Sequence, residues 1–165
     1  DAPEATEALG DVRGRIDHLV NNPGHTRPAT FHRRLGEILY TGCGVSRSEA
    51  GLTRALEQVQ ELREEFWRDV RVTGTDRLNQ ELEKAGRVAD FLELAELMIT
   101  DALDRQESCG AHFREEYALP DGEAKRDDKR WCNVSAWETN PAGQHRRYQE
   151  PLRFESVKLQ VRNYR

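Results

Sequence analysis

The stretch that decides the fold is Val88–Leu103, VADFLELAELMITDAL, where apolar residues recur every three or four positions. This spacing predicts an α-helix, and the apolar positions extend around most of its circumference. A helix with so wide an apolar arc is buried on more than one side. We therefore expect a helix from about Asp76 to Ser108 that is the central member of a bundle, or that also faces a surface outside this chain.

Three further helices are predicted upstream, at about Ala5–Val20, at about Thr30–Tyr40, and after the sequence Ser46–Glu49. The first carries one apolar face, made of Leu9, Val12, Ile16, Leu19 and Val20. In the second, the residues expected to face inward are Phe31, Leu35, Ile38 and Leu39. The third has a stripe over about five turns, consisting of Leu52, Leu56, Val59, Leu62, Phe66 and Val70. Ser46–Glu49 fits a capping box in which Ser46 is the N-cap and Glu49 reaches back. Leu78, Leu82 and Ala85 are expected to continue the stripe in the first half of the central helix.

The character of the sequence changes after Tyr117. A turn at 119–122 and a charged loop at 124–130 precede residues with strand propensity at 131–137. A turn at 140–143 predicts that 146–148 return as the second strand of a hairpin, and 151–165 form an extended tail. The predicted fold is therefore mainly α: a three- to four-helix bundle, similar to a spectrin repeat, over 1–118, followed by a loop, a β-hairpin and a basic C-terminal tail over 119–165.

Composition limits the classes of function. The net charge is −5, which argues against a dedicated nucleic-acid-binding protein, because phosphate contacts need concentrated Lys and Arg. No run of about 18 apolar residues is present, so no membrane-spanning helix is expected. Three widely spaced cysteines do not make a disulfide framework, and reduced thiols are the simpler interpretation.

Two cysteine–histidine combinations suggest chemistry at first sight. Cys109 and His112 have the spacing of zinc ligands, and Cys132 and His145 follow later. Structural zinc sites usually contain two such tight pairs, and here there is one. A cysteine nucleophile needs an activating base and groups that orient the reaction, and none of the latter can be identified. We therefore interpret Cys109 as a small buried residue at the end of a helix, with His112 hydrogen-bonded nearby.

The C-terminal tail is basic. Between Gln144 and Arg165, six positive charges stand against Glu150 and Glu155; they are Arg146, Arg147, Arg153, Lys158, Arg162 and Arg165. Charges at a strand edge also protect against aggregation, so a solvated edge is one interpretation. The other is a docking surface for an acidic neighbouring subunit, since arginine and aromatic residues are enriched at interfaces. The candidate interface residues are Arg146, Arg147, Arg153 and Lys158.

Two segments carry a resemblance to a known family. Glu107–Glu116, ESCGAHFREE, closely resembles the ESRGAH-type segment near the end of the flavoprotein subunits of succinate dehydrogenase and fumarate reductase. Gly44–Leu52 resembles the turn of the same family into its long helix, and Arg126–Asp128 follows in the family's order. The motif residues that match are Glu107, Gly110, His112 and Arg114, to which the resemblance gives a structural role. Cys109 departs from the pattern, because many members have arginine at this position.

The resemblance implies a C-terminal helical domain with three main helices, joined to upstream FAD-binding and capping domains. The parent protein would interconvert succinate and fumarate on FAD and pass electrons through an iron–sulfur subunit to a membrane anchor. Its expected place is the cytoplasm, at the inner face of the membrane through these partner subunits. The family's catalytic and flavin-binding residues lie upstream, so no catalytic, cofactor or metal residue is carried over, and the chain alone is expected to be inactive.

Two alternatives remain beside this interpretation. One is an independent helical interaction module without a redox role, and the other is the matching domain of L-aspartate oxidase. An exposed apolar patch on the central helix would favour the domain of a larger protein, because a self-sufficient module should cover it.

Overall fold

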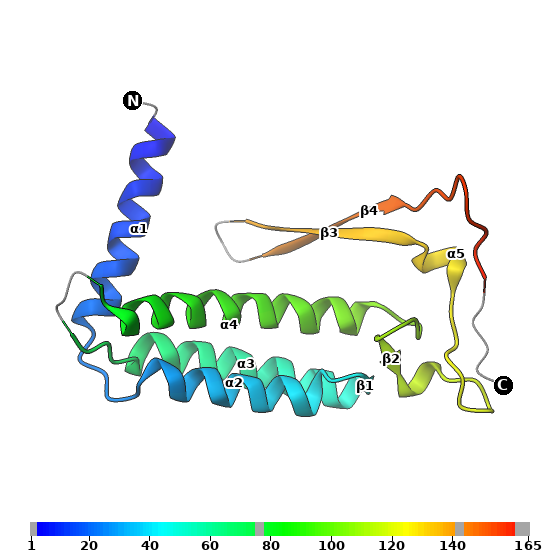
Figure 1. Cartoon of the computed structure of the whole chain (residues 1–165), viewed down its shortest axis with the longest axis horizontal. Coiled ribbons are helices and arrows are strands. Elements are labelled where there is room, and N and C mark those ends of the chain that lie inside the picture. Colours follow the sequence, from blue (N-terminus) through cyan, green and yellow to red (C-terminus); the bar gives the residue numbers. More distant parts are fainter. Residues whose placement is uncertain (1–2, 75–77, 141–143, 161–165) are drawn as a thin grey trace.

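The structure, a computed structural model, describes residues 3–74, 78–140 and 144–160, and it confirms a mainly helical fold with a small C-terminal hairpin (Figure 1). The helices are α1 (Pro3–Asn21), α2 (Pro28–Gly42), α3 (Glu49–Asp69), α4 (Gln80–Asp104), the 3-10 helix η1 (Glu115–Tyr117) and α5 (Asp128–Trp131). The strands are β1 (Ser46–Arg47), β2 (Phe113–Arg114), β3 (Asn133–Thr139) and β4 (His145–Pro151). Within the described ranges, no helix combines the length and the hydrophobicity needed to cross a membrane.

The core lies between α2, α3 and α4. Phe31 of α2 meets Phe66 of α3 edge to face, with ring centroids 5.3 Å apart, an arrangement that aromatic pairs prefer. The apolar stripe predicted for the third helix is buried, apart from the partly buried Leu56. Of the residues predicted to face inward from the second helix, Phe31 and Leu35 are buried, and Ile38 and Leu39 pack partly buried against the core.

The first helix is present, but its apolar face is not buried against the bundle. Of its apolar side chains, Leu19 is buried, and those exposed are Leu9, Val12, Ile16 and Val20. The reason is geometric, because α1 rises from one end of the three-helix core at a steep angle to the other helices, so most of its length lies away from the bundle (Figure 1). Its side contact with α4 is polar: Arg15 donates to the carbonyl of Gly86 and pairs with Asp90.

The central helix is shorter than predicted at both ends. It begins at Gln80 because Asn79 acts as the N-cap and accepts from the backbone N–H of Leu82 at 3.0 Å. Leu78 therefore precedes the helix and is 91% exposed, against the prediction that it continues the buried stripe. The predicted start at Asp76 falls outside the described residues. At the other end the helix stops at Asp104, so 105–108 are irregular.

The N-cap of α3 also differs from the prediction. Ser48, not Ser46, has the extended backbone of an N-cap, and its side chain accepts from the N–H of Gly51 at 3.1 Å. Ser46 instead begins β1, which pairs in parallel with β2. The predicted capping box was wrong because tertiary strand pairing takes up the residue that the local pattern assigns to the cap.

The C-terminal part begins with a short helix where a charged loop was predicted. Trp131, expected to start the first strand, ends α5, and β3 starts two residues later. The hairpin pairs Asn133 with Pro151 through Thr139 with His145. Of the predicted turn at 140–143, residues 141–143 fall outside the described residues.

The hairpin is anchored to the last turns of α4. Trp137 donates to Asp101 at 2.7 Å, and Arg147 pairs with Asp104. The following residues, 152–160, have no regular secondary structure and are exposed, whereas Val161, Arg162 and Arg165 lie outside the described residues.

Candidate functional site

The two family-like segments, which are separated in sequence by most of α3 and all of α4, meet at one end of the bundle. Ser46 pairs with Phe113 and Arg47 with Arg114, so β1 and β2 join the start of α3 to the loop after α4. The site is therefore a junction between two helix ends and the C-terminal part of the chain.

Arg114 is the centre of this junction, and its side chain is 1% exposed. Its Nη1 donates to the carbonyls of Ala102 at 2.9 Å and Leu103 at 3.2 Å, which belong to the last turn of α4. Its Nε donates to Glu116 at 3.2 Å. The last carbonyls of a helix lack intrahelical partners and carry partial negative charge. The buried guanidinium therefore donates hydrogen bonds to these carbonyls and also compensates their charge.

Glu116 continues the link to the other helix. Its Oε1 accepts from the backbone N–H of Glu49, the first residue of α3, at 2.6 Å. Burial by itself would raise the pKa of Glu116, but hydrogen bonds from the N–H groups of Glu49 and Glu116 and from Arg114 outweigh it and hold that pKa below its ordinary value. Arg114 and Glu116 thus place opposite charges at the C-terminus of α4 and the N-terminus of α3, where each is stabilising.

The loop between Ser108 and Arg114 is closed on itself. The buried Ser108 hydroxyl accepts from the N–H of Arg114 at 2.8 Å and donates to its carbonyl at 3.1 Å. Cys109 and His112 exchange two backbone hydrogen bonds, and Gly110 within this turn has φ +60°, a conformation that favours glycine. Cys109 is half-buried and lies past the helix end, not buried at it as predicted.

His112 is held between two elements in a defined tautomer. Arg47 donates to its Nδ1 at 2.8 Å, so Nε2 carries the proton and donates to the carbonyl of Arg105 at 3.0 Å. Burial lowers the pKa of His112, and the guanidinium groups of Arg47, Arg105 and Arg114 lower it further, against the opposing hydrogen bond to Arg105. The neutral ring is therefore the form that fits the folded structure. His112 has a structural role there, as a hydrogen-bonding group and not as an acid.

This assignment predicts a pH dependence of stability. Because the pKa of His112 is lower in the folded chain than in the unfolded one, the free energy of unfolding is highest above about pH 6.5, the ordinary histidine value. It should fall as the pH decreases from there through the folded pKa, since the unfolded chain then binds the proton first. Urea unfolding at a series of pH values checks this, with His112→Gln as the variant that lacks the titration. Parallel curves for the two proteins between about pH 5 and pH 7 would contradict it.

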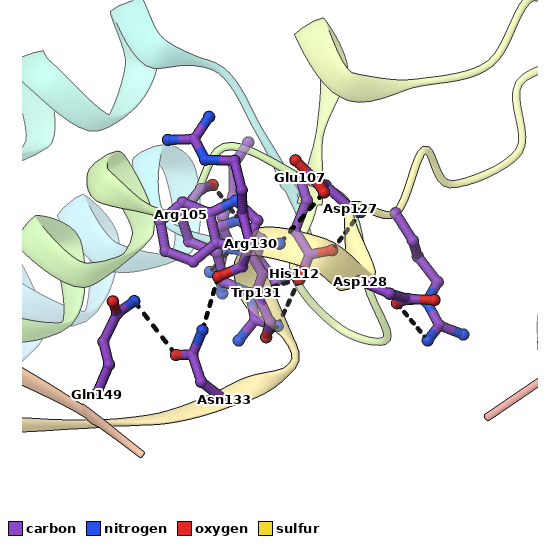
Figure 2. A network of polar contacts seen from close by, with 11 residues as sticks. Arg105, Glu107, His112, Asp127, Asp128, Arg130, Trp131, Asn133 and Gln149 are labelled. Atoms are coloured by element: carbon purple, nitrogen blue, oxygen red, sulfur yellow. Dashed lines mark hydrogen bonds and ion pairs between the residues drawn. The ribbon is translucent and has the colours of Figure 1, made fainter. Parts of the chain in front are cut away.

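Glu107 connects the junction to the C-terminal part. Its side chain is 2% exposed; Oε1 accepts from Arg105 Nε at 2.9 Å, and Oε2 accepts from the backbone N–H of Asp127 at 2.8 Å. Asp127 in turn caps α5 by accepting from the N–H of Arg130. Figure 2 shows Glu107 beside Asp127 and the side chains around α5. One buried carboxylate thus fixes the start of α5 relative to the end of α4.

The structure separates the candidate interface residues. Arg147 faces the bundle, where it pairs with Asp104 and lies 5.2 Å from the ring centroid of Trp131. Arg146, on the opposite face of β4, lies over Tyr148. Arg153 and Lys158 are exposed in the segment after the hairpin. Among the described residues, neither Arg146, Arg153 nor Lys158 has an ion-pair partner.

The site residues do not form a cradle for a flavin or other dinucleotide. Such a cradle needs a glycine-rich turn leading into a helix, whose N–H groups meet the pyrophosphate. Gly110 instead lies in a turn that leads into the two-residue strand β2. In the part of the chain that the structure describes, no three His, Cys, Asp or Glu residues gather in the manner of metal ligands.

Sequence reasoning missed three members of the junction. Glu116 ends the second family-like segment, but its hydrogen bond to the first N–H of α3 is a contact across 67 residues. Arg47 and Arg105 both contact His112, and the spacing of residues in the sequence does not predict these contacts. A signal was present in part, because Arg47 lies in the first family-like segment.

Comparison with known proteins gives a consistent family. A family model described as fumarate reductase flavoprotein C-term matches residues 32–164. The fumarate reductase flavoprotein subunit of Proteus vulgaris is 29% identical over 150 residues, 90% of this chain and 23% of the relative. The succinate dehydrogenase flavoprotein subunit of Rickettsia bellii is 28% identical over 142 residues, 86% of this chain and 23% of the relative.

A solved structure agrees with the sequence matches. A mutant quinol fumarate reductase of E. coli has a chain that superposes with a TM-score of 0.79 and 28% identity, covering 96% of this chain and 26% of that one. This chain therefore spans about a quarter of the length of its relatives. It belongs to the succinate dehydrogenase and fumarate reductase flavoprotein family, and it corresponds to the C-terminal helical domain of those subunits.

Proposed function

We propose that this chain is the scaffold and subunit-docking domain of a flavoprotein that interconverts succinate and fumarate and passes electrons to an iron–sulfur subunit. In this proposal, residues 1–118 pack against upstream FAD-binding and capping domains, and 119–165 help to hold the iron–sulfur subunit. The enzyme would work on the cytoplasmic side of the membrane, to which its partners and a membrane anchor subunit attach it. The FAD would be held by residues outside this chain, since those described here do not fit it.

The scaffold role is supported by an uncovered apolar stripe on the central helix. Phe91, Leu94 and Met98 recur at helical spacing on α4 and are 41%, 52% and 46% exposed. In the view of Figure 1, α1 and the hairpin both extend above α4, so these elements flank the same side of the bundle. An independent module should cover such a stripe, and this favours a domain that packs against the rest of a larger protein.

The docking role is carried by one observation: three cations of the hairpin and tail are exposed and have no ion-pair partner among the described residues. Arg146 is on the outer face of β4, and Arg153 and Lys158 follow in the exposed segment. Arg147, which the sequence grouped with them, is neutralised by Asp104 and is better described as an anchor of the hairpin.

Replacing Arg146 and Arg153 together with Ser in the full-length flavoprotein tests this role. We expect affinity for the iron–sulfur subunit to fall by roughly tenfold at low salt, because two rim charges would lose their acidic partners. The difference should shrink at high salt, where exposed charges are screened. Titration of the two subunits at both salt concentrations measures it. The matched control is Arg33→Ser with Arg54→Ser, which removes two exposed charges from α2 and α3. Equal affinities of variant and wild type at low salt would contradict the role.

A further inference from the structure

The segment after the hairpin runs back beside α5. The N–H of Leu152 donates to the carbonyl of Cys132 at 3.0 Å, directly after α5. Eight residues later, Arg126 Nη1 donates to the carbonyl of Gln160 at 2.8 Å, just before α5. These two contacts fix both ends of the segment 152–160 against the segment 126–132, and Figure 1 shows them at the same end of the molecule.

The two segments together present more basic residues than the tail does alone. From the α5 side come Lys129 and Arg130, both exposed, and from the tail side come Arg153 and Lys158. Among the described residues none of these four cations has an ion-pair partner, whereas Arg126 is neutralised by Asp128. The negative charges on the same segments are fewer: Glu155 is exposed, and the Asp127 carboxylate is the N-cap of α5.

Apolar side chains are exposed between these charges. Leu152, Phe154, Val157 and Leu159 are between 44% and 71% exposed, four of the nine residues from 152 to 160. A short, irregular segment gains nothing from presenting so many apolar groups to water. At protein interfaces, apolar residues provide burial and charges at the rim provide specificity, and this surface offers both.

The α5 side of this surface is fixed by contacts with α4 and the hairpin. Glu107, buried at the end of α4, bonds the N–H of Asp127 and so fixes the start of α5. Asn133 donates to the carbonyl of Arg130 at 2.7 Å and accepts from Gln149, which ties α5 to both strands of the hairpin (Figure 2). A preorganised surface loses less conformational entropy on binding than a flexible one.

We propose that α5 and residues 152–160 form one docking surface, and that it binds an acidic protein face bearing apolar residues. This inference rests on the proposed function, in which that partner is the iron–sulfur subunit, and it adds Lys129 and Arg130 as contact residues that the basic tail did not include. A basic surface is complementary in charge to an acidic one, and its exposed apolar side chains can be buried against apolar residues of a protein. Binding to a membrane surface typically uses a long amphipathic helix, and residues 152–160 are irregular.

The test replaces Lys129 and Arg130 together with Ser in the full-length flavoprotein and measures its affinity for the iron–sulfur subunit. We expect roughly tenfold weaker binding at about 50 mM salt and a much smaller difference at about 500 mM. The Arg33→Ser, Arg54→Ser protein is the control of equal charge and should bind like the wild type. Because Lys129 and Arg130 are exposed, the fold should be unaffected, and circular dichroism checks this.

Each other outcome overturns a defined statement. If the α5 variant binds normally and the Arg146→Ser, Arg153→Ser variant binds weakly, this inference is wrong and the proposed function stands. Normal binding by both variants overturns both. In a third outcome, the α5 variant binds the iron–sulfur subunit normally while only the wild type sediments with phosphatidylglycerol vesicles at low salt. In that case the surface binds lipid, and the inference that it binds a protein is wrong.

Discussion

Replacing Arg114 with Leu should lower the free energy of unfolding by about 3–5 kcal/mol, because each buried polar group left without its partner costs about 1–3 kcal/mol and the buried guanidinium serves two carbonyls. Leucine fills part of the volume but leaves the carbonyls of Ala102 and Leu103 without a donor. It also leaves Glu116 without its guanidinium partner, although that carboxylate still accepts from the N–H of Glu49. Most of the loss comes from the unsatisfied buried acceptors, because the half-exposed Glu116 remains accessible to water.

Urea unfolding followed by tryptophan fluorescence measures this loss. The control is Arg87→Leu, the same substitution in an exposed i,i+4 pair with Glu83, for which less than about 0.5 kcal/mol is expected. Arg114→Lys should lie between the two, because lysine keeps the charge but cannot bridge a carboxylate and two carbonyls at once. A loss below about 1 kcal/mol for Arg114→Leu would show that the junction does not depend on this residue.

The helices could be predicted from the sequence because their signal is local. The stripe from Leu52 to Val70 repeats every three or four residues, and the structure buries it as expected. The same periodicity in α1 correctly predicted which apolar side chains share a face, but it did not predict that most of them are exposed. Periodicity shows which side chains share a face, and it does not show whether another element of the same chain covers them.

The junction could not be predicted in the same way, because its contacts are long-range. Ser46 fits a cap as well as Ser48 does, and only pairing with Phe113 decides between them. Arg114 could be recognised as part of a motif, but its buried position follows from two helix ends meeting. Arg147 could be counted as a charge, whereas its inward direction depends on the pairing of β4 with β3 and on Asp104.

Glu107→Gln should cost about 2–3 kcal/mol, in the range for hydrogen bonds to a buried charged group. An amide side chain can still accept from Arg105, but its NH₂ group then faces the N–H of Asp127, which loses its acceptor. Arg114→Leu removes contacts that link α3 to α4, whereas Glu107→Gln removes a contact that attaches α5. This second loss should therefore be accompanied by a local change that a general loss of stability does not produce.

Hydrogen exchange distinguishes these two effects. In Glu107→Gln the amides of Asp127, Arg130 and Leu152 should exchange much faster, because each is bonded within the unit that Glu107 positions. Amides in the middle of α3 should slow or quicken only as the global stability changes. Glu57→Gln, on the exposed face of α3, is the matched control and should change neither. If α5 and α3 lose protection equally, Glu107 stabilises the whole bundle and does not specifically position the docking surface. A loss confined to α5 and Leu152 would explain how a buried motif residue, far from any charge of the tail, determines where those charges are presented.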